Sequence, residues 1–312
     1  MWDLLDPYYY EFFVRGVIAA TLAGALCGLV GVFIVLRGMS YIGHGLSHSI
    51  FGGFAVSSVV GANYYLGAGV WGLASALAVN AIARSKRIGA DAAIGVITTA
   101  SFAFGIALIS IFGSRGASFD AALFGSILGI RPLDLWVLAG VTAAVVAIIV
   151  SRYRALLFTS FDPDVAGAHG VRVAATDALL MLALSISILA TLNVIGVTLV
   201  AAALVIPAVV ARMLTHSFAR MLVLSTAIGS VGGFVGMNLS YHLDVPSGTM
   251  IVLTDAAFFL VVLAATSARS LPEVTRRSAA DVGLGSPPRP CDTRPGRDRP
   301  PASTATRSPR PG

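Results

Sequence analysis

Long apolar runs, separated by short polar stretches, make up most of the 312-residue chain. The first run without a charged residue extends from Gly16 to Leu36. At about 1.5 Å per residue, a helix of this length crosses the roughly 30 Å hydrocarbon core of a bilayer. Seven more apolar segments follow it, at residues 41–60, 65–83, 92–112, 133–150, 177–211, 221–241 and 250–265. This pattern predicts an all-α polytopic membrane protein.

Small residues recur every four positions within the first run, at Gly16, Ala20, Gly24 and Gly28. Positions i and i+4 lie on one face of a helix, and a stripe of small side chains allows another helix to approach closely. Such a stripe also arises by chance in a chain with 33 glycines. We interpret it as a packing face.

The run at 177–211 leaves the number of membrane-spanning helices open. A polar break at Asn193 and Gly196 suits either a tight pair of short helices or one long broken helix. Pro207, further along, kinks a helix or marks its break. The pair gives nine spans and the single broken helix gives eight, so we expect eight or nine transmembrane helices.

Basic residues are concentrated in short connections at 84–87, 151–176 and 212–220. Short basic loops of membrane proteins remain in the cytosol. We therefore place these three connections inside the cell and the connections at 113–131 and 244–248 outside. With nine spans, the N-terminus lies outside and the C-terminus inside.

The composition supports a lipid environment for most of the chain. It is 56% hydrophobic and only 12% charged, whereas soluble domains carry about 25% charged residues. Residues 267–312 differ, because they hold nine arginines against four acids and nine of the 14 prolines. A nucleic-acid-binding tail is one reading of this charge, but segments so poor in large apolar residues are typically disordered. We predict a membrane domain at 1–266, a disordered cytosolic tail at 267–312, and no nucleic-acid partner.

Two histidines, His44 and His48, stand four residues apart in the stretch GMSYIGHGLSHSIFGG. On a helix they share one face, and two imidazoles on one face can hold a borderline divalent metal. The alternative is that they form hydrogen bonds with neighbours in a polar seam. Because ionisable residues within membrane spans are costly and usually functional, we interpret the pair as ligands on a metal path. Two ligands bind weakly, which suits transport.

Two catalytic motifs are missing from the sequence. A zinc protease of the H-E-x-x-H type needs glutamate after His44, and the residue there is Gly45. No GxxxxGK[ST] phosphate loop occurs either, so any ATP that drives this protein binds to another chain. The cysteines, Cys27 and Cys291, form no metal-binding pattern. We predict a protein that is not an enzyme, with no catalytic residue and no permanently bound cofactor.

The connection FDPDVAGAHG predicts a short cytosolic helix. Asp162 suits the N-cap, Pro163 the first helical position, and Gly170 the residue that ends the helix. Such a helix is either a connector between two spans or a docking helix for a cytosolic partner, and its chemistry does not distinguish the two.

Four ordered stretches resemble the permease subunits of zinc, manganese and iron ABC transporters: VFIVLRGMSYIGHGLSHSIFGG, SFDPDVAGAHGV, NVIGVTLVAAALVIPAVVARML and SYHLDVPSGTMIVL. Together the matches cover most of residues 12–266. The resemblance implies a homodimer in the membrane, two ATP-hydrolysing subunits below it, and an extracytoplasmic metal-binding protein that delivers the metal. It also implies that the cytosolic helix is the coupling segment for the ATPase, with these residues: Asp162, Pro163, Asp164, Ala166 and Gly170.

In that family, His48 matches a histidine on the metal path, and the position of His44 is often aspartate. Nitrogen in place of oxygen shifts a site's preference from manganese toward zinc. We therefore predict a multi-pass plasma-membrane permease of an ATP-driven importer whose cargo is zinc first and manganese second. The alternative, a secondary metal transporter driven by an ion gradient, would need more buried carboxylates, and only Asp255 qualifies clearly.

Overall fold

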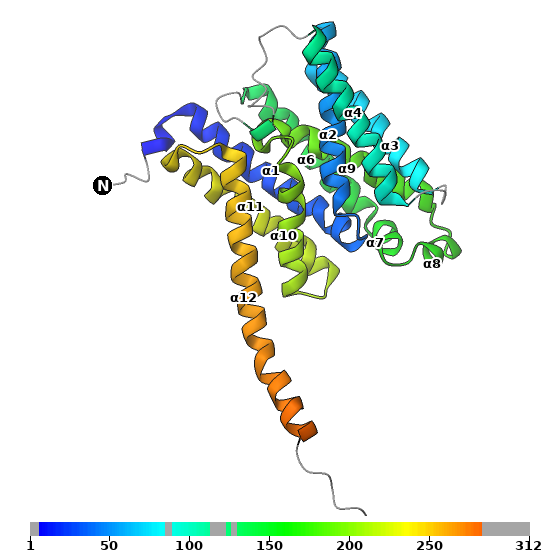
Figure 1. Ribbon diagram of the computed structural model, residues 1–312, viewed down its shortest axis with the longest axis vertical. Coiled ribbons are helices and arrows are strands. Elements are labelled where there is room, and N and C mark those ends of the chain that lie inside the picture. Colours follow the sequence, from blue (N-terminus) through cyan, green and yellow to red (C-terminus); the bar gives the residue numbers. More distant parts are fainter. Residues whose placement is uncertain (1–5, 85–88, 113–122, 126–129, 283–312) are drawn as a thin grey trace, which may run out of the picture. The chain divides into compact units, whose positions relative to one another are not determined.

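A computed structural model of the protein describes residues 6–84, 89–112, 123–125 and 130–282 (Figure 1). The secondary structure in these ranges is helical throughout, which confirms the predicted all-α class. The principal helices, in chain order, are η1 (Asp6–Tyr9), α1 (Glu11–Leu36), α2 (Tyr41–Val60), α3 (Tyr64–Arg84), α4 (Ala90–Phe112), α6 (Pro132–Ser151), α7 (Tyr153–Phe161), α8 (Pro163–Ala168), α9 (Val173–Ile195), α10 (Val200–Leu214), α11 (Phe218–Leu243) and α12 (Ser247–Val282).

Seven of these helices are long and apolar enough to cross a membrane: α1, α3, α4, α6, α9, α11 and the part of α12 from Ser247 to Ser267. Helix α2 has 20 residues, but its two histidines and four serines make it less apolar. Helix α10 is apolar but has only 15 residues. With these two, the helices correspond one for one to the spans of the nine-span alternative.

The run at 177–211 forms two helices. Helix α9 ends at Ile195, and Gly196 takes φ +90° and ψ 156° before α10 begins at Val200. This backbone region is accessible almost only to glycine. A side chain at position 196 would also collide with the backbone around Phe124. The paired arrangement is therefore right and the single broken helix is wrong, and Pro207 lies inside α10.

Helix α1 is the most buried of the membrane helices and contacts α9, α10 and α11. The predicted small-residue stripe is its contact face with α11. Gly24 lies against Gly229, and the hydroxyl of Ser225 donates a hydrogen bond of 2.5 Å to the carbonyl oxygen of Gly28. The two backbones approach so closely that a methyl group on Gly24 would overlap the carbonyl group of Gly229.

We expect Gly24→Ala to destabilise the protein by about 1–3 kcal/mol, because the helices must separate to admit the added methyl group. The measurement is the thermal midpoint of the purified protein in detergent. Gly140→Ala in α6 is the matched control, since a methyl group there meets no atom within 4 Å. It should leave the midpoint equal or higher, because alanine restricts the unfolded chain more than glycine does. Equal midpoints for the two variants would contradict the close packing of α1 on α11.

Helix α2 packs against α3 and α4 and also contacts α9 and α10. Its buried face includes Leu46, Ile50 and Phe51, which are at most 1% exposed. Helix α2, which carries the two histidines, is thus held between helices from both halves of the chain.

The chain divides into two compact units, Met1–Ser267 and Ala268–Gly312. The division lies one residue from the predicted boundary between 266 and 267. Helix α12 continues to Val282, beyond the predicted end of the last span at 265. The rest of the predicted tail, 283–312, lies outside the described residues, so its disorder stays a prediction. Most of the connections predicted at 84–87 and 113–131 also lie outside the described residues.

Candidate metal path and coupling segment

A tight turn between α1 and α2 places the two histidines. Gly38 takes φ +67°, and the amide of Met39 donates a 3.1 Å hydrogen bond back to the carbonyl oxygen of Ile34. Helix α2 then begins at Tyr41. His44 therefore lies in the first turn of a regular helix, and His48 lies one turn further along.

The rings of His44 and His48 pack edge to face across one helical turn. Their centroids are 4.4 Å apart, and their planes meet at 77°. Two imidazoles that bind one ion through nitrogens at about 2.1 Å bring their centroids to within roughly 5 Å of each other. The spacing predicted from sequence thus brings the two rings into contact, and their centroids are close enough for both to reach one ion.

Both imidazoles are half-buried, and Nδ1 of His48 is buried without a hydrogen-bond partner among the described residues. An unsatisfied polar atom in an apolar region is unfavourable by about 1–3 kcal/mol. The alternative, in which His48 forms hydrogen bonds with its neighbours, is therefore not supported for Nδ1. In the tautomer that carries its proton on Nε2, this nitrogen has a lone pair available to a metal ion.

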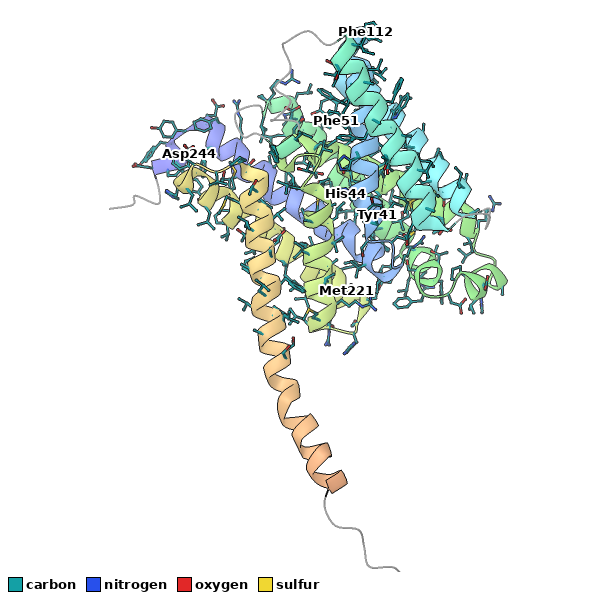
Figure 2. The ribbon with its side chains drawn as sticks, viewed as in Figure 1. Tyr41, His44, Phe51, Phe112, Met221 and Asp244 are labelled. Atoms are coloured by element: carbon teal, nitrogen blue, oxygen red, sulfur yellow. The ribbon has the colours of Figure 1, made fainter. Side chains whose placement is uncertain are left out.

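Aromatic rings surround the pair. His48 packs edge-on against Phe102 of α4, with centroids 4.4 Å apart, and the ring of Tyr41 lies 5.6 Å from that of His44. Figure 2 shows Tyr41, His44 and Phe51 in succession along α2. Within the described parts of the chain, no group of three or more His, Cys, Asp or Glu side chains could hold a metal ion. The candidate pair His44 and His48 offers two nitrogens, fewer than the four ligands that zinc usually takes.

Asp255 lies in the interior of α12 and is 1% exposed. Its side chain faces Gly232 of α11, where an added methyl group would collide with Oδ1. Nothing in the described structure joins this carboxylate to His44 or His48. Asp255, the one carboxylate that the sequence marked as buried, therefore lies at a contact between α11 and α12.

The predicted cytosolic helix is present as α8, Pro163–Ala168. The carboxylate of Asp162 accepts hydrogen bonds from the backbone amides of Asp164 and Val165, at 3.1 and 3.0 Å. Pro163 occupies the first position, and Gly170 takes φ +79° just beyond the end. The local chemistry of this segment was predictable because each of these interactions spans only a few residues.

The five residues expected to couple to an ATPase divide into two sets. Asp162, Pro163, Asp164 and Gly170 are exposed, whereas Ala166 is only 1% exposed. Ala166 therefore packs α8 onto the protein and presents no surface to a partner. Val165, which sequence reasoning did not select, is 44% exposed and offers an apolar contact. In the sequence, Val165 is an apolar residue within a polar connection, and this contrast is the feature that would have identified it.

A hollow of about 510 Å³ lies next to the end of α8. Arg152 and Arg172 line it together with Gly170 and Thr176. Both arginines are exposed, so this side of the coupling segment carries positive charge. A hollow of this kind can receive an acidic side chain.

The interactions of Arg37, which follows the first apolar run, were not predicted from the sequence. The guanidinium donates to Asp177 on α9 at 2.7 Å, to Thr159 at 3.0 Å and to Ser160 at 3.3 Å, the last two on α7. Arg212 of α10 also donates to the carbonyl oxygen of Val35, at 3.4 Å. These contacts bring the ends of α1, α7 and α10 and the beginning of α9 together. The basic ends of these helices therefore share one side of the bundle.

Comparison with known proteins finds relatives along most of the chain. The family model described as the ABC 3 transport family matches residues 9–266. The manganese transport system membrane protein MntC of Halalkalibacterium halodurans is 38% identical over 252 residues, which cover 80% of this chain and 86% of that protein. The manganese import system permease protein ScaB of Streptococcus parasanguinis is 36% identical over 252 residues, with coverages of 81% and 90%.

A solved structure shares the fold. The structure described as PsaBC from Streptococcus pneumoniae in complex with Fab superposes with a TM-score of 0.75 at 34% sequence identity. The match covers 83% of this chain and 94% of that chain. The regions that match include α2 and the coupling segment, since the family model extends from residue 9 to residue 266.

Proposed function

The chain belongs to the ABC 3 transport family, and from this premise we propose that it carries divalent metal ions along a path lined by His44 and His48. It is a multi-pass membrane permease of a metal-uptake ABC transporter, a transport component and not an enzyme. The observation that supports the metal path is the pair of adjoining imidazoles with an unpartnered nitrogen on His48.

The cargo we propose is manganese, as in the names of the relatives, together with zinc. Two relatives over 35% identical are named as manganese transport proteins. The ligands in this chain, however, are two imidazole nitrogens, which suit zinc better than manganese. His44, at the position where the family often has aspartate, is the residue that shifts the preference toward zinc.

We propose that the permease acts as a homodimer with two ATPase subunits and an extracytoplasmic metal-binding protein. A dimer would bring two histidine pairs to one path and so supply the four ligands that a single copy lacks. The exposed face of α8 and the hollow beside it, lined by Arg152 and Arg172, would receive the ATPase. ATP hydrolysis would then move the two copies between outward-open and inward-open states.

Radioactive zinc and manganese accumulation in cells that carry the whole transporter tests this proposal. We expect uptake of both metals, abolished when the partner ATPase is inactivated. His44→Asp should raise the manganese-to-zinc uptake ratio several-fold, because it introduces the oxygen ligand that manganese prefers. An unchanged ratio would assign selectivity to the delivering protein. Uptake that continues without ATPase activity would instead indicate a secondary transporter.

A further inference from the structure

The side chain of Arg37 is buried, with 9% exposure, and it joins three helices. Nη1 bonds to the carboxylate of Asp177, while Nη2 and Nε donate to the hydroxyls of Thr159 and Ser160. Each of the three guanidinium nitrogens thus has a partner on another helix. Because the guanidinium is planar and its donors have fixed directions, three such bonds hold the end of α1 in one position relative to α7 and α9.

On one side of this contact lies the coupling segment. Asp162 is both the residue that ends α7 and the N-cap of α8, and its amide donates a 2.9 Å bond to Phe158 within α7. Only Phe161 separates Ser160 from Asp162. The burial of Ala166 also keeps α8 packed onto the protein. A partner that displaces α8 must therefore displace the last turn of α7.

On the other side lies the histidine pair. Arg37 ends α1, and only residues 38–40 separate it from α2. Backbone hydrogen bonds close this turn, from Gly38 to Val35 at 3.3 Å and from Met39 to Ile34 at 3.1 Å. His44 follows in the first turn of α2. A displacement of Arg37 is therefore passed along a short, bonded segment to the helix that carries both histidines.

We propose that Arg37 is a positioning residue that transmits the movement of α8 to the histidine pair, through the hydroxyls of Thr159 and Ser160. This inference rests on the proposed function, in which an ATPase moves α8. Asp177 balances the charge of the buried guanidinium, and the two hydroxyls link it to α7. Without the hydroxyls, α7 can move while α1 and α2 remain in place, so ATP hydrolysis no longer moves metal efficiently.

The test uses the complete transporter, with its ATPase and metal-binding protein, in proteoliposomes. Thr159→Val is combined with Ser160→Ala, which removes both hydroxyls and leaves the ion pair of Arg37 with Asp177. Manganese transported and ATP hydrolysed are measured in the same vesicles. We expect the ratio of metal to ATP to fall about fivefold or more, while ATPase association and the rate of hydrolysis stay near those of the unmodified transporter.

Two further variants separate this role from a structural one. Thr142→Val in α6 is the matched control, because that hydroxyl donates only within its own helix, to Leu138 at 2.7 Å. Thr159→Ser combined with Ser160→Thr retains both hydroxyls. Both are expected to keep the ratio of the unmodified transporter.

The inference is overturned if the double variant that lacks both hydroxyls leaves the ratio unchanged, or if its transport and hydrolysis fall in parallel together with its thermal stability. In either case the unmodified transporter still moves metal, so only the role of Arg37 is rejected. If the unmodified transporter moves neither manganese nor zinc in response to ATP, the proposed function itself fails and the inference fails with it.

Discussion

Replacing His48 with alanine is expected to reduce the uptake of both zinc and manganese by about tenfold or more, since even the loss of a residue that merely supports a metal ligand typically costs 10–100-fold. The variant removes one of the two nitrogen ligands that we propose for each copy. It also removes the only described side chain that places an unpartnered, buried nitrogen beside His44. The measurement is the initial rate of radioactive metal accumulation at equal amounts of protein in the membrane.

The controls for this variant address folding and position. His216→Ala changes an exposed histidine in the connection between α10 and α11 and should leave uptake unchanged. His48→Asn keeps a polar side chain against Phe102, and it should also transport poorly because an amide is a weak ligand for zinc. Normal zinc uptake by His48→Ala, with normal expression, would show that the histidine pair is structural.

The positions of the membrane helices were predictable because the bilayer imposes length and hydropathy on each of them. The predicted segment at 41–60 coincides with α2, and the segment at 133–150 lies within one residue of α6 at each end. The last span, predicted at 250–265, lies within the apolar part of α12 from Ser247 to Ser267, but hydropathy does not mark where the helix itself ends. Helix α12 accordingly continues from its apolar part to Val282.

The break between α9 and α10 shows a limit of the sequence pattern. Asn193 and Gly196 indicated a break, but two short helices and one bent helix have the same hydropathy. The choice depends on the backbone of Gly196, which takes a conformation that only glycine adopts readily. It also depends on the neighbouring segment around Phe124, which approaches too closely for a side chain. That segment is about 70 residues away in sequence, so a local pattern cannot report it.

In the candidate site, too, interactions between residues close in sequence were predictable and those between distant residues were not. The histidine pair and the caps of α8 involve residues within four positions of each other, and the sequence predicted both. The contact of Arg37 with Asp177 joins residues 140 positions apart. In the sequence these are two charges at the edges of separate apolar runs, and only the packing of α1 against α7 and α9 brings them together. The burial of Ala166 was missed for the same reason, because it depends on what α8 packs against.

Because Ala166 is buried, a substitution at this position does not test docking on α8. A tryptophan at this position would be forced between α8 and the rest of the protein, so it tests internal packing. Overpacking of a buried position is unfavourable by about 1–3 kcal/mol or more. We therefore expect Ala166→Trp to lower the thermal midpoint as well as metal uptake, and it serves as the comparison for a variant on the exposed face.

Ala168→Trp places the same bulky side chain on the exposed side of α8, and we expect it to reduce metal uptake by about tenfold or more while the thermal midpoint stays unchanged. A clash that costs an interface about 1.4 kcal/mol weakens binding tenfold, and a tryptophan at the contact with the ATPase should exceed that. The measurements are metal uptake, recovery of the ATPase with the purified permease, and the thermal midpoint. Ala62→Trp, an exposed position between α2 and α3, is the matched control and should retain the ATPase. If Ala168→Trp transports metal normally and still retains the ATPase, α8 is only a connector between α7 and α9.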